Sequence, residues 1–144
     1  EMFGDTVRSR LYLGSLFSVS DYLQAQRVRS KLRFEFAQMF QRVDVIAGPT
    51  KGRPAAPLSA EGADALAVMG RPSFCSPFDQ TGLPALSIPC GFNKDGLPIG
   101  LQVAGKPFDE ALVLRVGHAY QEQARWHERR PLPSSGREGL GSPC

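Results

Sequence analysis

The stretch that decides the fold is TGLPALSIPCGF, residues 81–92, with its continuation PIGLQVAG, residues 98–105. Both are apolar runs of strand length, and the connecting NKDGL, residues 93–97, contains an Asp-Gly pair that tolerates positive φ. The pattern predicts a β-hairpin. Because proline cannot donate to a β-ladder, we expect Pro89 and Pro98 at a strand end, a bulge or an outward-facing register.

Two residues of this stretch, Ser87 and Cys90, could in principle act as nucleophiles. Serine catalysis needs a base within hydrogen-bond reach and donors aimed at the developing oxyanion. Ser87 instead lies between Leu86 and Ile88 in the predicted strand, and no Gly-x-Ser-x-Gly elbow surrounds it. Nothing in the sequence argues for an activated thiolate at Cys90 either, so we interpret both as structural and assign no catalytic residue.

Upstream of the hairpin, a long apolar periodicity predicts an amphipathic helix, which we expect Ser20 or Asp21 to cap. Its apolar residues recur mostly at spacings of three and four: Tyr22, Ala25, Val28, Leu32, Phe36, Met39, Phe40 and Val43. Before it, residues 5–17 are expected to be a short helical or mixed segment. Downstream, a second amphipathic helix is predicted from an Asp109 cap.

Three shorter segments complete the predicted order of elements. VDVIAGPT, residues 43–50, has the pattern of a short buried strand that ends at a breaker. ADALAVMG, residues 63–70, is expected to form one or two helical turns, and RPSFCSPFDQ, residues 71–80, a short irregular helix. The predicted elements thus include both strands and helices, which indicates the α/β class.

Composition excludes several classes of protein. The 144 residues suit one domain, and no apolar run reaches the roughly 18 residues of a membrane span. A net charge of +3 is too small to indicate a nucleic-acid partner. Cys75, Cys90 and Cys144 lack metal-site spacing, and His118 and His127 lie too far apart for a helical metal pair, so we expect no metal. Unpaired cysteines favour a reducing compartment, the cytoplasm.

The quoted residues resemble a known family over most of the chain, from about Arg8 to Arg130. Residues 78–123, with TGLPA, IPCGF, GLPIGLQ and GKPFDE in that order, are similar to the C-terminal part of amidase signature enzymes. Upstream, RLYLG at residues 10–14 and VDVIAGPT resemble further segments of that family. The resemblance implies an α/β fold in which helices flank a mixed β-sheet.

The same resemblance implies a domain organisation and an activity. Residues 1–130 would form the C-terminal part of an amidase signature domain, and residues 131–144 a disordered tail. Family members hydrolyse a carboxamide C–N bond with a Ser-Ser-Lys triad and no cofactor. The lysines of this chain match none of the triad positions, so the family's N-terminal part is the expected partner. A small amide is the expected substrate, without membrane or direct nucleic-acid contact, and a homodimer is left open.

One candidate substrate-binding residue follows from the resemblance. In the glutaminase subunits of tRNA-dependent amidotransferases, which are members of the family, the arginine matching Arg10 holds a substrate carboxylate, although Arg10 could equally solvate a helix end. Where those subunits have a substrate-binding aspartate and an asparagine, this chain has Pro72 and Asp79, which favours a general amidase over a glutaminase. Phe74 and Phe78 are either walls of an acyl pocket or core residues. A non-catalytic interaction protein is the remaining alternative.

Overall fold

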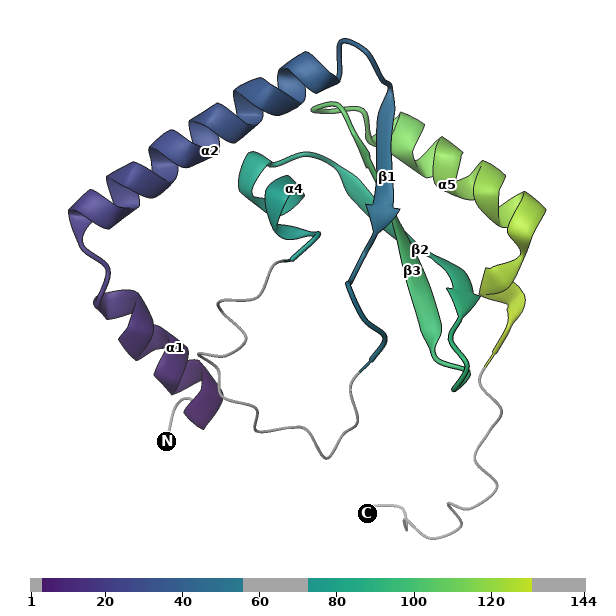
Figure 1. The fold of residues 1–144 in the computed structure, drawn as a ribbon, viewed down its shortest axis with the longest axis horizontal. Helices are drawn as coiled ribbons and strands as arrows, with labels where there is room; N and C mark the ends of the chain where they lie inside the picture. The colour runs from purple at the N-terminus through teal and green to yellow at the C-terminus, as the bar shows by residue number, and fades with distance from the viewer. Residues whose placement is uncertain (1–3, 56–72, 131–144) are drawn as a thin grey trace, which may run out of the picture.

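The computed structural model describes residues 4–55 and 73–130 (Figure 1). The elements are α1 (Asp5–Ser15), α2 (Val19–Met39), β1 (Val45–Pro49), α4 (Ser76–Thr81), β2 (Ala85–Phe92), β3 (Pro98–Gly105), α5 (Glu110–Ala124) and the 3₁₀ helix η2 (Trp126–Glu128). The helical turns predicted for residues 63–70 and the tail at residues 131–144 lie outside the described residues.

The predicted hairpin is present. β2 and β3 pair antiparallel, from Ala85 opposite Ala104 to Phe92 opposite Pro98. In the turn, the side-chain oxygen of Asn93 accepts hydrogen bonds from the amides of Asp95 at 3.0 Å and Leu97 at 2.8 Å. These bonds close the turn without help from other elements, so the hairpin is specified locally.

Both prolines of the hairpin lie where a missing N–H group does the least harm. The register of β2 shifts between Pro89 and Gly91, and Gly91 has a φ of 153° that side chains rarely adopt. Pro98 is the first residue of β3. The bulge and the strand end were two of the expected positions.

β1 completes a three-stranded sheet in the order β1-β3-β2. It pairs antiparallel with β3, from Val45 opposite Gly105 to Pro49 opposite Leu101. The most deeply buried residues, Val103 and Ala104, lie on the central strand β3 and are 2% and 0% exposed. The chain is therefore α/β as predicted, and the strands that the structure describes all pair antiparallel.

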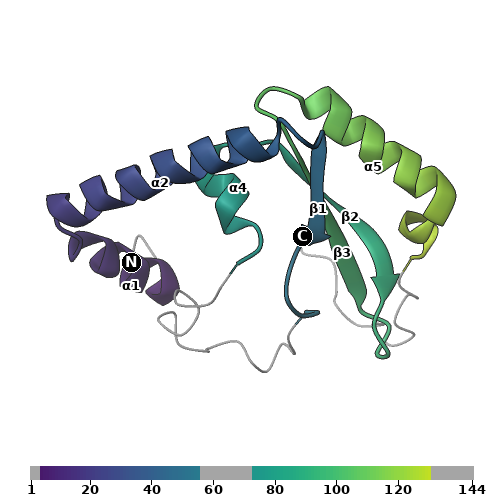
Figure 2. The same cartoon turned by 45° about the horizontal axis from the view of Figure 1, so that its top comes forward.

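Helix α5 covers one face of this sheet (Figure 2). A Cβ atom on Gly117 would collide with the side chain of Leu86, and one on Gly105 would lie 2.6 Å from Cγ2 of Val113. Helix and strands thus approach closely because two glycines face the contact. Asp109 is the N-cap residue as predicted, although its side chain makes no capping hydrogen bond to a described residue.

The cap of α2 differs from the prediction. The N-cap is Ser18, not Ser20 or Asp21, and it forms a capping box with Asp21. The amide of Asp21 donates to Oγ of Ser18 at 3.1 Å, and the Ser18 amide donates to Oδ2 of Asp21 at 2.9 Å. The hydroxyl and amide of Ser18 lower the pKa of the Asp21 carboxyl, so the box is charged and intact at neutral pH.

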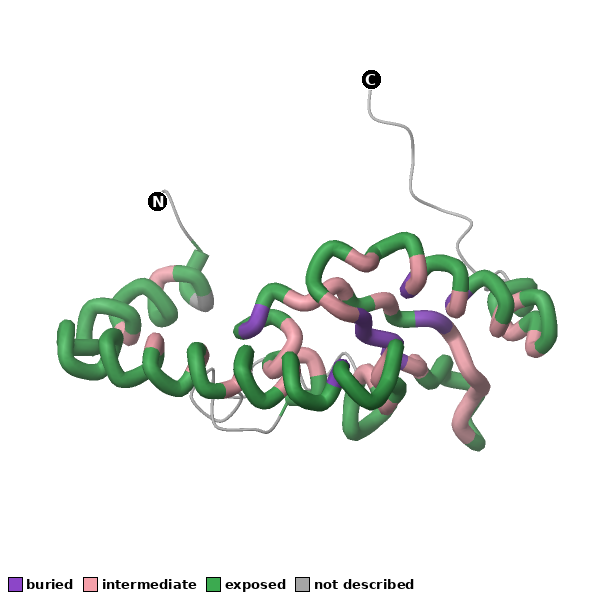
Figure 3. The backbone as a smooth tube through the Cα atoms, turned by 90° about the horizontal axis from the view of Figure 1, so that it is seen from above, coloured by how far each residue is buried: buried purple, intermediate pink, exposed green. Residues whose placement is uncertain are grey.

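The apolar face predicted for α2 exists as a pattern but is only partly covered. Phe40 is buried and Phe36 is half-buried, because Phe36 packs on Phe78 of α4 at a ring distance of 5.5 Å. Nε of Arg29 donates to the carbonyl oxygen of Gln80 at 2.7 Å and fixes α4 further. The other half of α2 extends away from the sheet and is exposed along most of its length (Figure 3).

The described part of the chain has three regions (Figures 1 and 2). The sheet lies between α5 on one side and the α2–α4 pair on the other. α1 lies next to the N-terminal end of α2, which is the end remote from the sheet. Among the described helices, none is long and apolar enough to cross a membrane.

Candidate functional site

A row of polar side chains crosses the sheet face opposite α5. Thr50 follows β1 and Ser87 lies in β2, and their hydroxyl oxygens are 2.7 Å apart. Gly100 lies beneath this pair: a Cβ atom there would be 2.7 Å from Oγ1 of Thr50 and 3.0 Å from Oγ of Ser87. The hydroxyl pair therefore forms only because residue 100 lacks a side chain.

The segment before α4 is attached to the same face. Nε2 of Gln102, a buried residue directly opposite Ser87, donates to the carbonyl oxygen of Phe74 at 3.1 Å. Sγ of Cys75 contacts the carbonyl oxygen of Thr50 at 3.3 Å. Polar groups of all three strands or their ends thus meet here, and we call Thr50, Cys75, Ser87 and Gln102 the inner-face cluster.

In the part of the chain that the structure describes, no activating base contacts either candidate nucleophile. Within the described ranges, Oγ of Ser87 has only the Thr50 hydroxyl as a hydrogen-bond partner. Cys90 is a half-buried free thiol. His118 lies on the exposed side of α5, with Nε2 at 3.6 Å from Oε1 of Glu122. The cluster can hold or orient a neighbouring segment, but by itself it offers neither a base nor an oxyanion hole.

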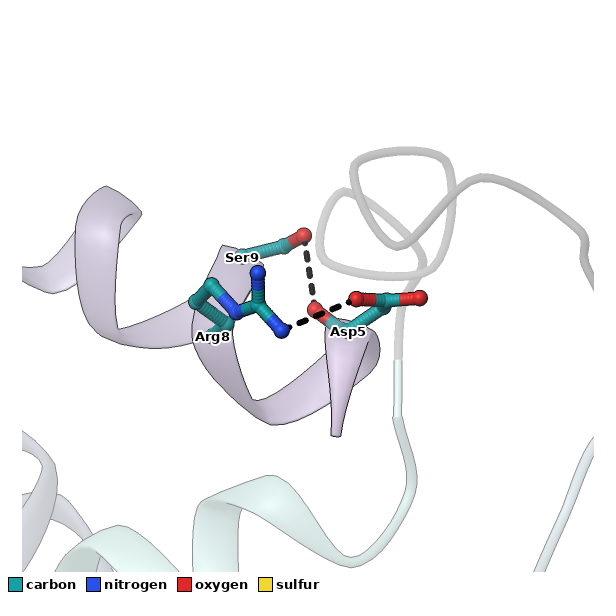
Figure 4. Close-up of polar contacts among 3 residues, drawn as sticks. All are labelled: Asp5, Arg8 and Ser9. Carbon is teal, nitrogen blue, oxygen red and sulfur yellow. Dashed lines mark hydrogen bonds and ion pairs between the residues drawn. The ribbon is translucent and has the colours of Figure 1, made fainter. Parts of the chain in front are cut away.

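Arg10, the candidate carboxylate ligand, lies on α1 and is exposed. It makes no ion pair with any residue in the described ranges. The preceding turn of the helix is fixed by Asp5, which pairs with Arg8 at 3.2 Å and accepts from the Ser9 hydroxyl at 2.9 Å through its carbonyl oxygen (Figure 4). Arg10 is thus an exposed residue of α1, a helix that lies away from the sheet on which the inner-face cluster is built (Figure 1).

The other candidate residues fall into different environments. Phe78 packs on Phe36, which fits the core interpretation, whereas the side chain of Phe74 is 47% exposed. Asp79 is exposed on α4, and Pro72 lies outside the described residues. Sequence reasoning missed Thr50 and Gln102, whose roles come from contacts between distant segments.

The described residues thus form an α/β arrangement in which α5 packs on one face of a three-stranded sheet and the inner-face cluster, with Gln102 buried and Ser87 exposed, lies on the other. A family model described as Amidase matches residues 1–114. The chain belongs to the amidase family, as the resemblance of its sequence had indicated.

Two curated relatives show how the match is distributed. The chain is 44% identical over 134 residues to the A subunit of the glutamyl-tRNA(Gln) amidotransferase of Chloroflexus aggregans, covering 90% of this chain and 27% of the relative. It is 43% identical over 137 residues to an amidase of Pseudomonas putida, covering 91% and 29%. The chain thus spans a little over a quarter of the length of these relatives.

Two solved structures also match this chain over less than a third of their own length. The chain superposes on a crystal structure of an amidase with a TM-score of 0.69 at 29% identity, covering 85% of this chain and 29% of that one. For the A subunit of the glutamyl-tRNA(Gln) amidotransferase of Thermotoga maritima, the TM-score is 0.66 at 30% identity, covering 88% and 28%. The arrangement of helices and hairpin is therefore that of one region of an amidase domain.

Proposed function

We propose that this chain supplies the C-terminal part of an amidase domain that hydrolyses a carboxamide C–N bond. The observation that carries this proposal is the amidase family match over residues 1–114. The domain assignment of residues 1–130 and the disordered tail at residues 131–144 are part of the proposal. The free thiols of Cys75 and Cys90 support a reducing compartment such as the cytoplasm.

The chemistry assigns this chain a supporting role. Amide hydrolysis needs a nucleophile, a base and donors for the developing oxyanion. The inner-face cluster does not combine these three kinds of group. The Ser-Ser-Lys triad of amidase signature enzymes would therefore come from the larger part of the domain. The inner-face cluster would then brace the sheet beneath that part.

Exposed apolar side chains support the existence of such a covering part. Many large ones on α1 and α2 are about half exposed or more: Val7, Leu11, Tyr12, Val19, Tyr22, Leu23, Val28, Phe34 and Met39. So many large apolar side chains exposed on two successive helices favour an interaction surface there. Its proposed occupant is the remainder of an amidase domain, because matched relatives are more than three times as long as the segment they share with this chain.

A segment swap tests the proposal. The part of the Pseudomonas putida amidase that matches this chain is replaced by this chain, and hydrolysis of simple amides is measured. We expect the swapped enzyme to retain activity within about 100-fold of the parent, which corresponds to a rise of at most about 2.7 kcal/mol in the activation free energy. A swapped enzyme that folds but hydrolyses no amide would contradict the proposal.

A second candidate function is the glutaminase reaction of a tRNA-dependent amidotransferase. The 44% identity to the Chloroflexus aggregans protein favours it as much as the 43% identity favours an amidase. Asp79, which replaces the asparagine of those glutaminases, argues against it. Comparing glutamine with simple amides in the swapped enzyme separates the two, because a glutaminase hydrolyses glutamine preferentially.

Arg10→Ala tests the proposed carboxylate contact. We expect the swapped enzyme to lose roughly 10- to 100-fold in kcat/KM on carboxylate-bearing amides, as hydrogen bonds to a charged group contribute about 1.5–3 kcal/mol. Activity on uncharged amides should stay unchanged. Arg27→Ala, which removes an exposed arginine of α2, is the control. Equal losses on both kinds of amide would make Arg10 structural.

A further inference from the structure

A cavity lies at the turn end of the β2–β3 hairpin, and no residue of the inner-face cluster lines it. Its volume is about 700 Å³, and it is bordered by the β2–β3 turn and by η2 with the residues that follow it. The lining residues that matter for the argument are Phe92, Lys94, Trp126, His127, Arg129 and Arg130. A cavity of this volume is large enough for a small organic molecule.

The floor of this cavity is aromatic and carries a stacked guanidinium group. The rings of Phe92 and Trp126 meet edge to face, with centroids 6.1 Å apart. The guanidinium carbon of Arg129 lies 5.0 Å from the Trp126 centroid and 5.6 Å from the Phe92 centroid. Cation–π contacts hold the planar group in place while its N–H donors remain available for an anion.

Among the described residues, the charged side chains that line the cavity are all cations, and the Asp95 carboxylate lies beside them, 3.2 Å from Nδ2 of the lining residue Asn93. Lys94, Arg129 and Arg130 all line the cavity, and no carboxylate of a described residue does. None of these three cations forms an ion pair within residues 4–55 and 73–130. The nearby carboxylate of Glu128 is 3.7 Å from Arg125, outside the lining. Three unpaired cations beside a concave aromatic wall attract an anion of more than one charge.

We infer that this cavity binds a small phosphate ester with an attached ring, such as a nucleoside monophosphate. Arg129 would hold the phosphate in two parallel hydrogen bonds, with Lys94 and Arg130 as further cations. The walls formed by Phe92 and Trp126 would contact the ring. The inference is independent of the proposed amide chemistry, so either can fail without the other.

The test uses the only tryptophan of the sequence as a reporter inside the cavity. The 144-residue chain is titrated with adenosine monophosphate, inorganic phosphate and adenosine, followed by Trp126 fluorescence and calorimetry. We expect adenosine monophosphate to bind with a dissociation constant below about 1 mM. We expect inorganic phosphate to bind at least about tenfold more weakly, and adenosine not at all.

Variants separate recognition from folding. Arg129→Ala should weaken binding of adenosine monophosphate at least about tenfold, whereas Arg115→Ala, on exposed α5 surface away from the cavity, should leave it unchanged. A Lys94→Gln/Arg130→Gln double variant keeps the stacked arginine and should also bind more weakly. Adenosine binding as tightly as its monophosphate, or both cavity variants binding like the parent chain, would overturn the inference.

Discussion

Val103→Asp is expected to abolish the cooperative unfolding transition of the chain. Val103 is 2% exposed on the central strand, opposite Leu86, and Leu86 in turn contacts α5. A carboxylate there has no partner and must be buried as a charge or protonated, which costs well above about 4 kcal/mol. Circular dichroism during urea unfolding measures the loss.

Two further valine variants show whether the cost comes from the charge. Val103→Ala removes only two methyl groups and should lower the free energy of unfolding by about 1–2 kcal/mol. Val43→Asp adds the same charge at a position that is 41% exposed and should change stability by less than about 0.5 kcal/mol. If Val103→Asp unfolded at the same urea concentration as Val43→Asp, the core position of Val103 would be wrong.

Gly100→Val is expected to destabilise the chain by about 2–4 kcal/mol. Even the first atom of the new side chain would lie 2.7 Å from Oγ1 of Thr50, so the Thr50–Ser87 hydrogen bond must break and β1 must shift. Overpacking costs typically about 1–3 kcal/mol, and the lost hydrogen bond adds about 1 kcal/mol. The midpoint of urea unfolding reports the change.

The neighbouring strand offers a matched control. Gly48, in β1, has nothing within 4 Å of where a Cβ atom would lie. Gly48→Val should therefore be neutral or slightly stabilising, because a β-branched residue suits a strand and restricts the unfolded chain. Equal effects at the two glycines would show that the inner face is not packed as the structure has it.

The hairpin could be predicted because its information is local. The Asp-Gly turn, the two apolar runs and the positions of Pro89 and Pro98 all lie within residues 85–105. The predicted N-cap of α2, Ser20 or Asp21, was wrong by two or three residues, because Ser18, Ser20 and Asp21 are all residue types that favour the N-cap position. Only the reciprocal bonds show that Asp21 is the third helical residue of the box and Ser18 its cap.

The inner-face cluster could not be predicted, because it depends on contacts between distant segments. Thr50 meets Ser87 across 37 positions, and Gln102 reaches Phe74 across 28. No periodicity or motif encodes such pairs without the sheet order. The stacking of Arg129 could not be predicted for the same reason. The basic residues beside it are visible in the sequence, but its contact with the Phe92 ring requires the hairpin to lie beside η2.

The strand order also sets a sequence of events in folding. β2 and β3 close across a short turn, whereas β1 must wait for a partner that follows it by about 60 residues, since Val45 pairs with Gly105. Loop closure makes distant pairing slow, so the hairpin with α5 should form early and β1 should join late. During synthesis, β1 leaves the ribosome well before β3 exists, and its unpaired edge is the point at which a stalled chain would aggregate.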